Sequence, residues 1–422
     1  MHRDTAVDSL LGDISQVGEA YQSGEQGARE RLMKSCQSLL SHLILPAESM
    51  IMTQWAHPTH NAVIRLGLDI HLFEALQGDG AQNDTDEAGR DSAAQLQPKS
   101  QSTSAIAART DPRTEPALVG RMLRHLAAMG TVREVGPDAF APTPFTRALT
   151  REDFRDSVMY IQDDYQPCLS QWPDFFRANG YAAPASSLDT PFTHTNGCGG
   201  RLNMFEFFGA HAPRMGKRFA GMMGVWSRDR PKWFQDGYYP VRERLVEGAS
   251  QGDAGGRRGV PSRCRRGSGH DLQQLLESFH GDVLPGKLIL QDRPEIVEIA
   301  EPVAGIEKMS HDFLTEQPIK GARAYYLHSI IQDWDDETNI KILQALVPAM
   351  KKGYSKILIN DYVIPNVGAH WLQTSLDCEL MSTLGARHRT EAEMRNMIKG
   401  AGLTVVGIYR HPLSLDCVVE VE

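Results

Sequence analysis

The 422-residue sequence lacks any apolar run near the roughly 20 residues that a membrane-spanning helix needs, so a helical membrane protein is excluded. The segment after Met1 has no apolar secretory core, and we therefore expect a soluble, cytoplasmic chain. The six cysteines include no Cys-x-x-Cys pair, so we expect neither a metal site nor a disulfide framework. The formal net charge of −9 argues against general nucleic-acid binding.

What the sequence has is the composition of an ordinary globular protein, 41% hydrophobic and 23% charged. Its length predicts about two to three domains, each with its own core. We expect a helical and winged-helix dimerisation domain over 1–150 and a helical, aromatic-rich linker and substrate-pocket region over 151–250. A Rossmann-like α/β domain is expected over 251–422.

The first of these domains combines helical patterns with one low-complexity segment. Apolar residues at helical spacing predict helices up to about residue 50. The segment over 62–73 is apolar on more than one face, which predicts a buried helix or a helix in a subunit interface. Residues 78–104 are almost all small or polar, and we expect a disordered insertion there. A helical stripe over 117–126 is followed by alternation over 132–143, which is the helix–hairpin order of a winged helix. Such a unit can read DNA, but the neighbourhood is not strongly basic, so a structural or dimerising use is favoured.

The middle region is rich in aromatic residues with interleaved methionines. Most of these side chains are expected to pack in a core, and a ligand pocket with adaptable walls is the alternative. Apolar walls of this kind suit a flat or hydrophobic molecule.

From about residue 270 the pattern alternates between strands and helices. Strands are expected at 287–292, 324–328, 355–363, 403–409 and 414–421. Helices are expected from Pro294 and over 336–350, and Thr390 with Glu393 forms a capping box that opens another helix. Two strands close the chain, so we predict a mostly parallel α/β sheet with an antiparallel C-terminal edge.

Polar residues at the strand ends mark the expected binding site. In an open α/β sheet, ligands bind at the carboxyl ends of the strands, near a glycine-rich first turn. Gly267 and Gly269 are the candidate turn, and Asp292 ends a strand where a carboxylate can accept both ribose hydroxyls of a nucleoside. A Gly-x-Gly alone is typical of a plain loop, but with Asp292 downstream it predicts a bound nucleoside.

Several stretches together carry a specific family pattern: Ala117–Thr146, Gly267–Leu272, Leu290–Asp292, His311–Phe313, Tyr325–Trp334, Ile357–Pro365 and Arg387–Thr390. From about Trp55 onward, the chain resembles the S-adenosylmethionine-dependent O-methyltransferases of plant and fungal secondary metabolism. That resemblance implies a Rossmann-like methyltransferase sheet preceded by a dimerising winged-helix half, and therefore a homodimer.

The resemblance also implies roles for particular side chains. Asp292 would hold the ribose of S-adenosylmethionine, and His328 would lie near its methionine end. Asp312 and Phe313 would contact the adenine. The partner molecule would be a small polyketide-like, aromatic or hydrophobic acceptor. Its expected pocket walls are Met222, Trp226, Ser227, Trp371 and Met381.

One stretch departs from the family. Gly255–Arg266 is basic and contains a proline where the family has an apolar strand ending in Asp-Val-Gly-Gly-Gly, so we expect that it cannot form a buried central strand. Reading its codons one base later permits Phe-Leu-Leu-Asp-Val-Gly-Gly, which would run directly into Gly267–His270. We therefore hypothesise a local frameshift, with genuine divergence as the alternative. If the printed sequence is what is made, cofactor binding should be damaged.

The catalytic positions depart as well. In the family a histidine before Asp-Trp removes the proton of the acceptor, and Gln332 stands there. An amide cannot take up a proton near neutral pH. The glutamates that orient the family histidine correspond to Asp361 and His388. His388 is a candidate relocated base because an imidazole has an ordinary pKa of about 6.5, and a surface histidine beside two arginines is the alternative.

Three functions are consistent with these residues. The first is methyl transfer from S-adenosylmethionine to an oxygen of a polyketide-like aromatic molecule. The second is cofactor-assisted dehydration or pericyclic ring closure, a Diels–Alder-type cyclisation of a polyketide–amino-acid intermediate, as in some fungal members of the family. A hydrogen-bond donor such as Gln332 would suffice for that chemistry. The third is an inactive scaffold or transcriptional co-regulator.

Overall fold

The computed structural model describes residues 5–78, 100–226, 230–247, 260–264, 270–279, 286–300 and 302–422. The predicted glycine turn with Gly267 and Gly269 lies outside these residues, and so do Ser227 and most of the predicted insertion. Among the helices described, none is both long and apolar enough to cross a membrane.

The chain divides into two compact units. The first consists of Met1–Pro173 with Phe205–Asp229, and the second of Asp174–Met204 with Arg230–Glu422. The region predicted as one linker over 151–250 is therefore shared between the two units. The functional division into three domains stays a prediction.

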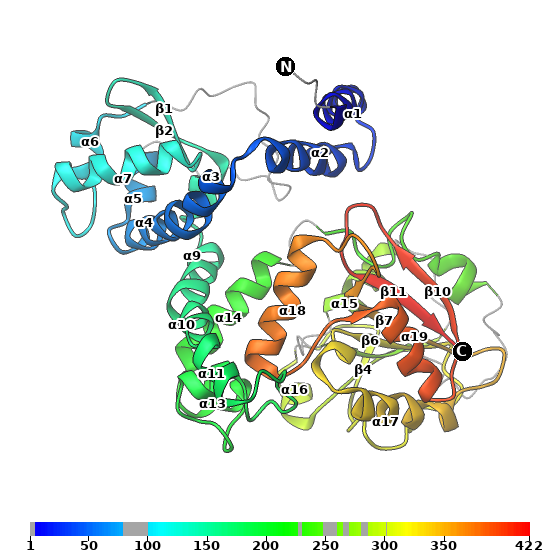
Figure 1. The fold of residues 1–422 in the computed structure, drawn as a ribbon. Coiled ribbons are helices and arrows are strands. Elements are labelled where there is room, and N and C mark those ends of the chain that lie inside the picture. Colours follow the sequence, from blue (N-terminus) through cyan, green and yellow to red (C-terminus); the bar gives the residue numbers. More distant parts are fainter. Residues whose placement is uncertain are drawn as a thin grey trace. The chain divides into compact units, whose positions relative to one another are not determined.

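The first unit is mainly helical (Figure 1). Its helices are α1 (Thr5–Gln22), α2 (Ala28–Leu43), α3 (Pro46–Ile51), η1 (Met52–Ala56), α4 (His57–Asp69), α5 (Leu72–Gln77), α6 (Thr103–Ala107), α7 (Pro116–Ala128), α8 (Pro144–Ala148), α9 (Glu152–Met159), η2 (Tyr160–Tyr165), α10 (Gln166–Ser170), α13 (Met204–Ala210) and α14 (Pro213–Trp226). Helix α11 (Trp172–Ala178) crosses the boundary between the units. An antiparallel hairpin of β1 (Val132–Gly136) and β2 (Ala139–Pro142) follows α7, in the predicted helix–hairpin order.

The core of this unit forms where α4, α5, α6 and α7 turn their apolar stripes toward one another and toward the hairpin. Leu68, Phe73 and Leu123 are fully or almost fully buried there, and Phe140 of β2 joins them. Burial of these stripes explains why the helical spacing was readable in the sequence.

The prediction of disorder over 78–104 is wrong for its last residues. Gln101 forms a β-bridge with Phe140, and its side-chain amide donates to the carbonyl oxygen of Leu76. The hydroxyl of Ser102 accepts from the amide of Ala105 and caps α6. Composition predicted disorder because it contains no information on contacts with residues far away in the sequence, such as Phe140 and Leu76. Residues 100–104 are therefore ordered.

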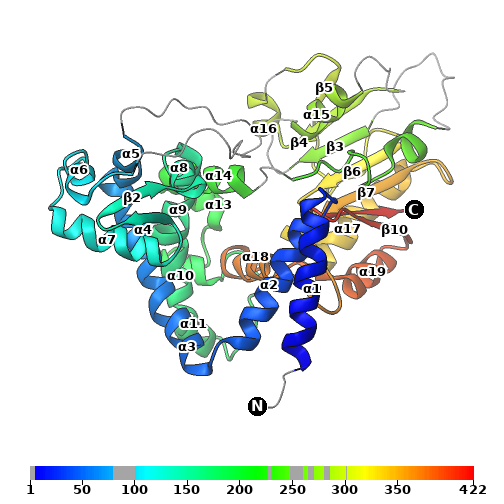
Figure 2. The ribbon, with the colours of Figure 1, turned by 90° about the horizontal axis from the view of Figure 1, so that it is seen from above.

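The second unit is an α/β sheet with helices on both faces (Figures 1 and 2). Its strands are β3 (Val260–Cys264), β4 (Leu288–Asp292), β5 (Ile306–Ser310), β6 (Ala324–His328), β7 (Lys356–Asp361), β8 (Val363–Ile364), β9 (Arg389–Thr390), β10 (Val405–Arg410) and β11 (Cys417–Val421). Its helices are α12 (Pro191–Thr195), η3 (Arg242–Val246), α15 (His270–Ser278), α16 (Pro294–Ile299), η4 (Ile331–Asp333), α17 (Asp336–Leu346), η5 (Val347–Ala349), α18 (Trp371–Leu384) and α19 (Glu391–Gly400).

Within the described residues the main sheet has seven strands in the order β10-β11-β7-β6-β3-β4-β5. Strands β7, β6, β3, β4 and β5 are parallel, and β11 pairs antiparallel with both β7 and β10. The predicted parallel sheet with an antiparallel C-terminal edge is confirmed. So is the capping box of α19, in which Thr390 and Glu393 exchange hydrogen bonds with each other's backbone amide.

Residues of alternate parity face two separate cores. Ile289, Leu327 and Ile359 pack with α17 and α19, whereas Leu290 and Leu358 pack with α15 and the segment before β3. Because both faces are covered, β4 and β7 are buried along their whole length. Such strands read as continuous apolar runs in the sequence.

The prediction that Gly255–Arg266 cannot form a central strand is wrong for Val260–Cys264. β3 lies between β6 and β4, where Ser262 pairs with both Leu290 and Tyr326. Proline removes one amide donor from the ladder, and the remaining backbone groups still pair with two neighbours that present complementary edges. Backbone pairing, rather than side-chain character, thus places this segment in the sheet.

Candidate functional site

The predicted cofactor residues that the structure describes lie at the carboxyl ends of the strands in the second unit. Asp292 ends β4, Asp312 and Phe313 follow β5, and His328 ends β6. The carboxyl ends of neighbouring parallel strands meet at the same edge, which is where open α/β sheets bind ligands. Asp292 is buried, and its Oδ1 accepts a hydrogen bond from the amide of Arg293 at 2.8 Å.

A polar network that the sequence analysis missed lies beside His328. Nδ1 of His328 is hydrogen-bonded to the carboxylate of Asp271, in the first turn of α15. The hydroxyl of Tyr326 donates to the same carboxylate at 3.4 Å and accepts from Nδ2 of Asn360 at 2.8 Å. The side chains on β6 and β7 lie on the same face of the sheet as Asp292, and Asp271 reaches them from α15. Because side chains alternate between the two faces of a strand, counting every second residue along β6 and β7 could have predicted this group from the sequence.

The three predicted catalytic residues come together near the carboxyl end of β7. Gln332 lies in η4, Asp361 ends β7 and His388 directly precedes β9. His388 Nε2 is 3.1 Å from Gln332 Oε1, and the backbone amide of Gln332 donates to Asp361 Oδ2 at 3.1 Å. His388, Gln332 and Asp361 are only 5%, 7% and 1% exposed. The alternative reading of His388 as a surface histidine is therefore wrong.

Two fully buried side chains fix the loop that carries Gln332. The Arg389 guanidinium donates to the carbonyl oxygens of Ile331 and Trp334 at 2.8 and 2.7 Å. The Asn339 amide donates to the same two carbonyls at 2.8 and 2.9 Å. Since Arg389 is the chain neighbour of His388, one guanidinium fixes the loop of Gln332 relative to the strand that carries the imidazole.

Two carboxyl groups next to Gln332 and His388 have a raised pKa. Burial raises the pKa of Asp361 to about 7; the nearby Asp333 carboxylate adds to this rise, and His328 and the Gln332 amide oppose it. Burial also raises the pKa of Asp377, whose Oδ1 accepts from the backbone amide of His388 at 2.7 Å. Asp361 therefore exchanges its proton near neutral pH.

The predicted substrate-pocket residues lie on two helices of different units. Met222 is buried on α14, and Trp226 ends that helix in the first unit. Trp371 begins α18 in the second unit and is 58% exposed, and Met381 lies further along α18. Their grouping into one pocket stays a prediction.

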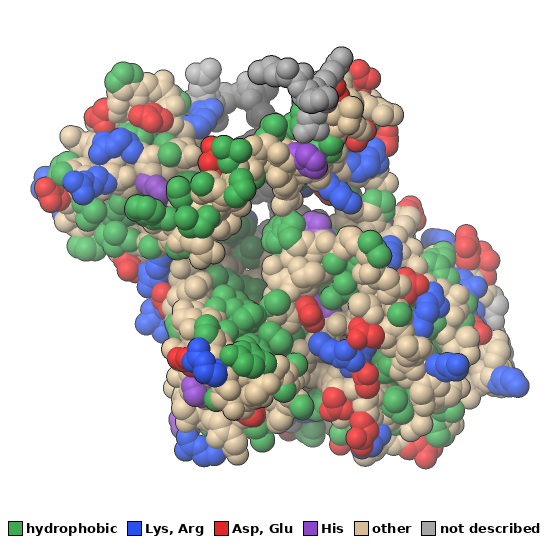
Figure 3. Space-filling model, viewed as in Figure 1, with side chains coloured by type: hydrophobic (Ala, Val, Ile, Leu, Met, Phe, Trp, Pro, Cys, Tyr) green, Lys and Arg blue, Asp and Glu red, His purple; other side chains and the backbone are tan. Residues whose placement is uncertain are grey.

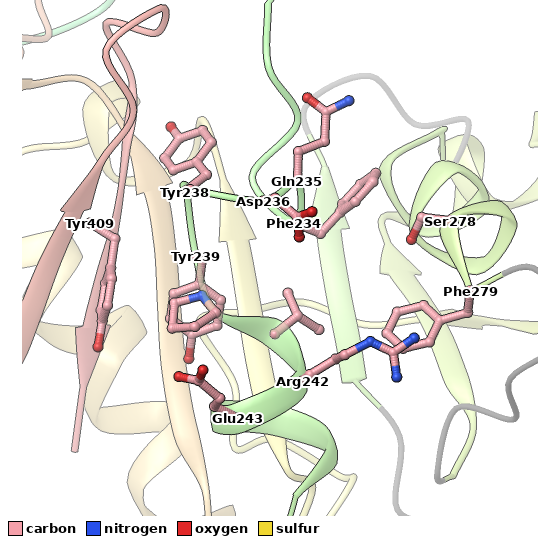
Figure 4. A pocket seen from close by; sticks show the side chains of 13 residues that line it. Phe234, Gln235, Asp236, Tyr238, Tyr239, Arg242, Glu243, Ser278, Phe279 and Tyr409 are labelled. Atoms are coloured by element: carbon pink, nitrogen blue, oxygen red, sulfur yellow. The ribbon is translucent and has the colours of Figure 1, made fainter. Parts of the chain in front are cut away.

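A cavity of about 820 Å³ lies elsewhere in the second unit, between the segment before η3, the end of α15 and β10 (Figure 4). Its walls include Tyr239, Arg242, Phe279 and Tyr409, and none of the predicted site residues. Tyr239 donates to the buried carboxylate of Glu420 at 3.0 Å and meets the Tyr409 ring edge-on at 4.9 Å. These contacts attach the segment to the sheet, so we read this wall as structural.

Comparisons with known proteins identify the family of this chain. Residues 276–404 match the O-methyltransferase domain family. The chain is 33% identical to the O-methyltransferase mpaG of Penicillium roqueforti over 422 residues, which cover 99% of this chain and 98% of that protein. The chain belongs to the O-methyltransferase family. It is also 34% identical to demethylsterigmatocystin 6-O-methyltransferase of Aspergillus parasiticus over 296 residues, or 69% of this chain and 72% of that protein.

Solved structures share the fold of this family member over nearly its whole length. A structure described as a pericyclic reaction enzyme has a TM-score of 0.76 and 24% identity, and covers 98% of both chains. The structure of LepI in complex with S-adenosylmethionine has a TM-score of 0.77 and 24% identity, and covers 99% of both chains. The prediction of an S-adenosylmethionine-dependent methyltransferase fold with a helical N-terminal part is confirmed, and so is membership of an enzyme family.

Proposed function

We propose that this chain transfers a methyl group from S-adenosylmethionine to a hydroxyl oxygen of a polyketide-like aromatic molecule in fungal secondary metabolism, with His388 as the general base. The contact of 3.1 Å between His388 Nε2 and Gln332 Oε1 carries this proposal. It places an imidazole next to the position where the family keeps its base. When bound, the cofactor supplies an electrophilic methyl group.

The residues at the sheet edge suit this cofactor chemically. The buried carboxylate of Asp292 is an acceptor for two ribose hydroxyls. The Asp271–His328 pair offers a carboxylate and an imidazole, which complement the ammonium and carboxylate of a methionine end. The Phe313 ring meets the Trp334 ring edge-on at 5.7 Å and offers an apolar wall for an adenine. We therefore assign cofactor binding to Asp292, Asp312, Phe313 and His328.

The contact with Gln332 supports Nδ1 as the basic atom of His388. With the amide oxygen of Gln332 as the acceptor, Nε2 of His388 carries the hydrogen and Nδ1 of the neutral ring keeps its lone pair. His388 Nδ1 then takes the proton of the acceptor hydroxyl, and Gln332 holds the ring in this tautomer. The Asp361 carboxylate accepts a hydrogen bond from the backbone amide of Gln332. It thereby helps to position residue 332, whose side-chain amide orients the imidazole of His388.

Incubation with methyl-labelled S-adenosylmethionine and a panel of polyphenols tests this function. We expect label transfer by the unchanged protein and a loss of about 10²-fold or more in His388→Gln, which is typical of removing a general base. His211→Gln, which changes an exposed histidine of the first unit, is the control and should transfer label normally. Undiminished transfer by His388→Gln would overturn the assignment of the base.

A second function is favoured by the amide at position 332. Gln332 can donate a hydrogen bond to a polarised carbonyl, and pericyclic or dehydration chemistry needs no strong base. The fold likeness to a pericyclic reaction enzyme supports this reading. It predicts tight binding of S-adenosylmethionine and conversion of a polyketide–amino-acid intermediate without label transfer. Absence of cofactor binding would instead indicate an inactive scaffold.

We also propose that the chain works as a homodimer through its N-terminal helices and its winged-helix region. Apolar side chains of α2, η1 and the segments beside them are 57% to 72% exposed, and they are Leu40, Leu43, Leu45, Met50 and Trp55. Hydrophobic side chains reach the surface around these helices in Figure 3. Exposed apolar patches of this kind mark interfaces. Light scattering should give twice the monomer mass, and a monomer would contradict this proposal.

A further inference from the structure

We propose that Tyr362 and Arg230 are positioning residues for His388, because Tyr362 packs against the imidazole and Arg230 contacts Tyr362. The inference rests on the proposed function, in which His388 is the base. It concerns the orientation of the imidazole ring, which the contacts described so far leave only partly fixed.

Tyr362 forms the wall against which the imidazole rests. It directly follows Asp361 at the end of β7, and only 7% of it is exposed. The centroids of the Tyr362 and His388 rings are 5.1 Å apart, and the ring planes meet at 42°. This tilted contact is within the range of attractive ring pairs.

Arg230 lies against the same tyrosine. Its guanidinium carbon is 5.7 Å from the centroid of the Tyr362 ring, and its Nη1 donates to the Tyr362 hydroxyl. The arginine therefore contacts both the ring and the oxygen of one side chain. Two contacts of different kinds define the ring position better than either alone.

Two other contacts of His388 act on single points and not on its ring plane. Asp377 receives a hydrogen bond from the backbone amide of His388, which sets the backbone and not the ring. Gln332 contacts the single atom Nε2, and one hydrogen bond allows the ring to rotate about its direction. A ring packed against the imidazole restricts that rotation, so Nδ1 keeps one direction. Small losses of alignment of this kind cost rate rather than binding.

The test measures kcat and acceptor KM for label transfer in a set of variants. Tyr362→Leu removes the ring, and we expect kcat to fall about tenfold or more while acceptor KM stays within about threefold. Tyr362→Phe keeps the ring and should retain most of kcat. Arg230→Met should lower kcat, and Arg230→Lys should recover part of the loss. Binding of labelled S-adenosylmethionine checks that each variant is folded.

A matched control lies at the other end of the same strand. Tyr354 precedes β7 and packs under the Arg323 guanidinium, whose carbon is 4.9 Å from the ring centroid. Tyr354→Leu removes a similar arginine–tyrosine pair away from the site. We expect it to leave kcat and KM unchanged.

The outcomes separate this inference from the proposed function. Full activity of His388→Gln would overturn the proposed function and the inference together. Loss of activity in His388→Gln with undiminished kcat in Tyr362→Leu would overturn the inference alone. If Tyr362→Leu does not bind the cofactor, the two Arg230 variants test the inference instead. Equal kcat in Arg230→Met, Arg230→Lys and the unchanged protein would overturn the inference.

Discussion

At position 332 an amide stands where the family resemblance expects a histidine base, and the imidazole that we propose as the replacement lies one hydrogen bond away at position 388. Residue identities were enough to predict that Gln332, Asp361 and His388 lie together, because all three fall in family motifs. The supporting residues could not be predicted in this way. Tyr362 and Arg230 are 132 positions apart. No local pattern reports a contact over such a separation.

Replacing Gln332 by histidine tests the exchange directly. We expect Gln332→His to raise label transfer by up to about tenfold, since it returns a base to the family position. Gln332→Asn is the control, because it keeps an amide and shortens it by one methylene. Equal rates in Gln332→His and the unchanged protein would mean that this position does not limit the reaction.

The raised pKa of Asp361 predicts a pH-dependent stability. The ordinary pKa of an aspartate is about 4, so folding favours the protonated form of Asp361. Its contribution to the free energy of unfolding therefore falls as the pH rises from about 4 through 7, by about 1 kcal/mol per pH unit. Asp361→Asn removes that loss and keeps an acceptor for the Gln332 amide. Urea unfolding at pH 5 and pH 8 should show the variant gaining roughly 2 kcal/mol on the unchanged protein across this range. A constant difference between the two would contradict this prediction.

At the scale of elements, close approach of two helices shapes the first unit. A Cβ added at Gly221 of α14 would come within 2.6 Å of the Cβ of Asp156 on α9 and 3.4 Å of the Asp153 carbonyl oxygen. The helix spacing therefore depends on a missing side chain. A helical pattern predicts that a helix forms, but it does not report which glycine permits contact with a neighbour.

Substitution of this glycine should weaken the unit. We expect Gly221→Val to lower the free energy of unfolding by about 2 kcal/mol, because overpacking outweighs any gain in helix propensity. Gly224→Ala on the same helix meets nothing within 4 Å and should be neutral or stabilising by up to about 1 kcal/mol. Thermal or urea unfolding measures both. Equal stability of the two variants would contradict the account of this helix contact.

At the scale of the whole molecule, the α/β class and the order of the later strands were predictable because buried strands carry long apolar runs. β3 was not, since its residues are basic and only its neighbours define its place. The division of residues 151–250 between two units could not be predicted either. Composition does not show that Asp174–Met204 packs with the second unit and Phe205–Asp229 with the first. The frameshift hypothesis for Gly255–Arg266 stays open to one test, sequencing of the transcript.

The central claim is that His388 supplies the base for methyl transfer. The most direct measurement is label transfer by His388→Gly in the absence and presence of added imidazole. We predict that the variant binds S-adenosylmethionine, transfers almost no label alone and regains activity in proportion to the neutral imidazole supplied. A variant that binds the cofactor and stays inactive with imidazole, or that is active without it, would contradict the claim.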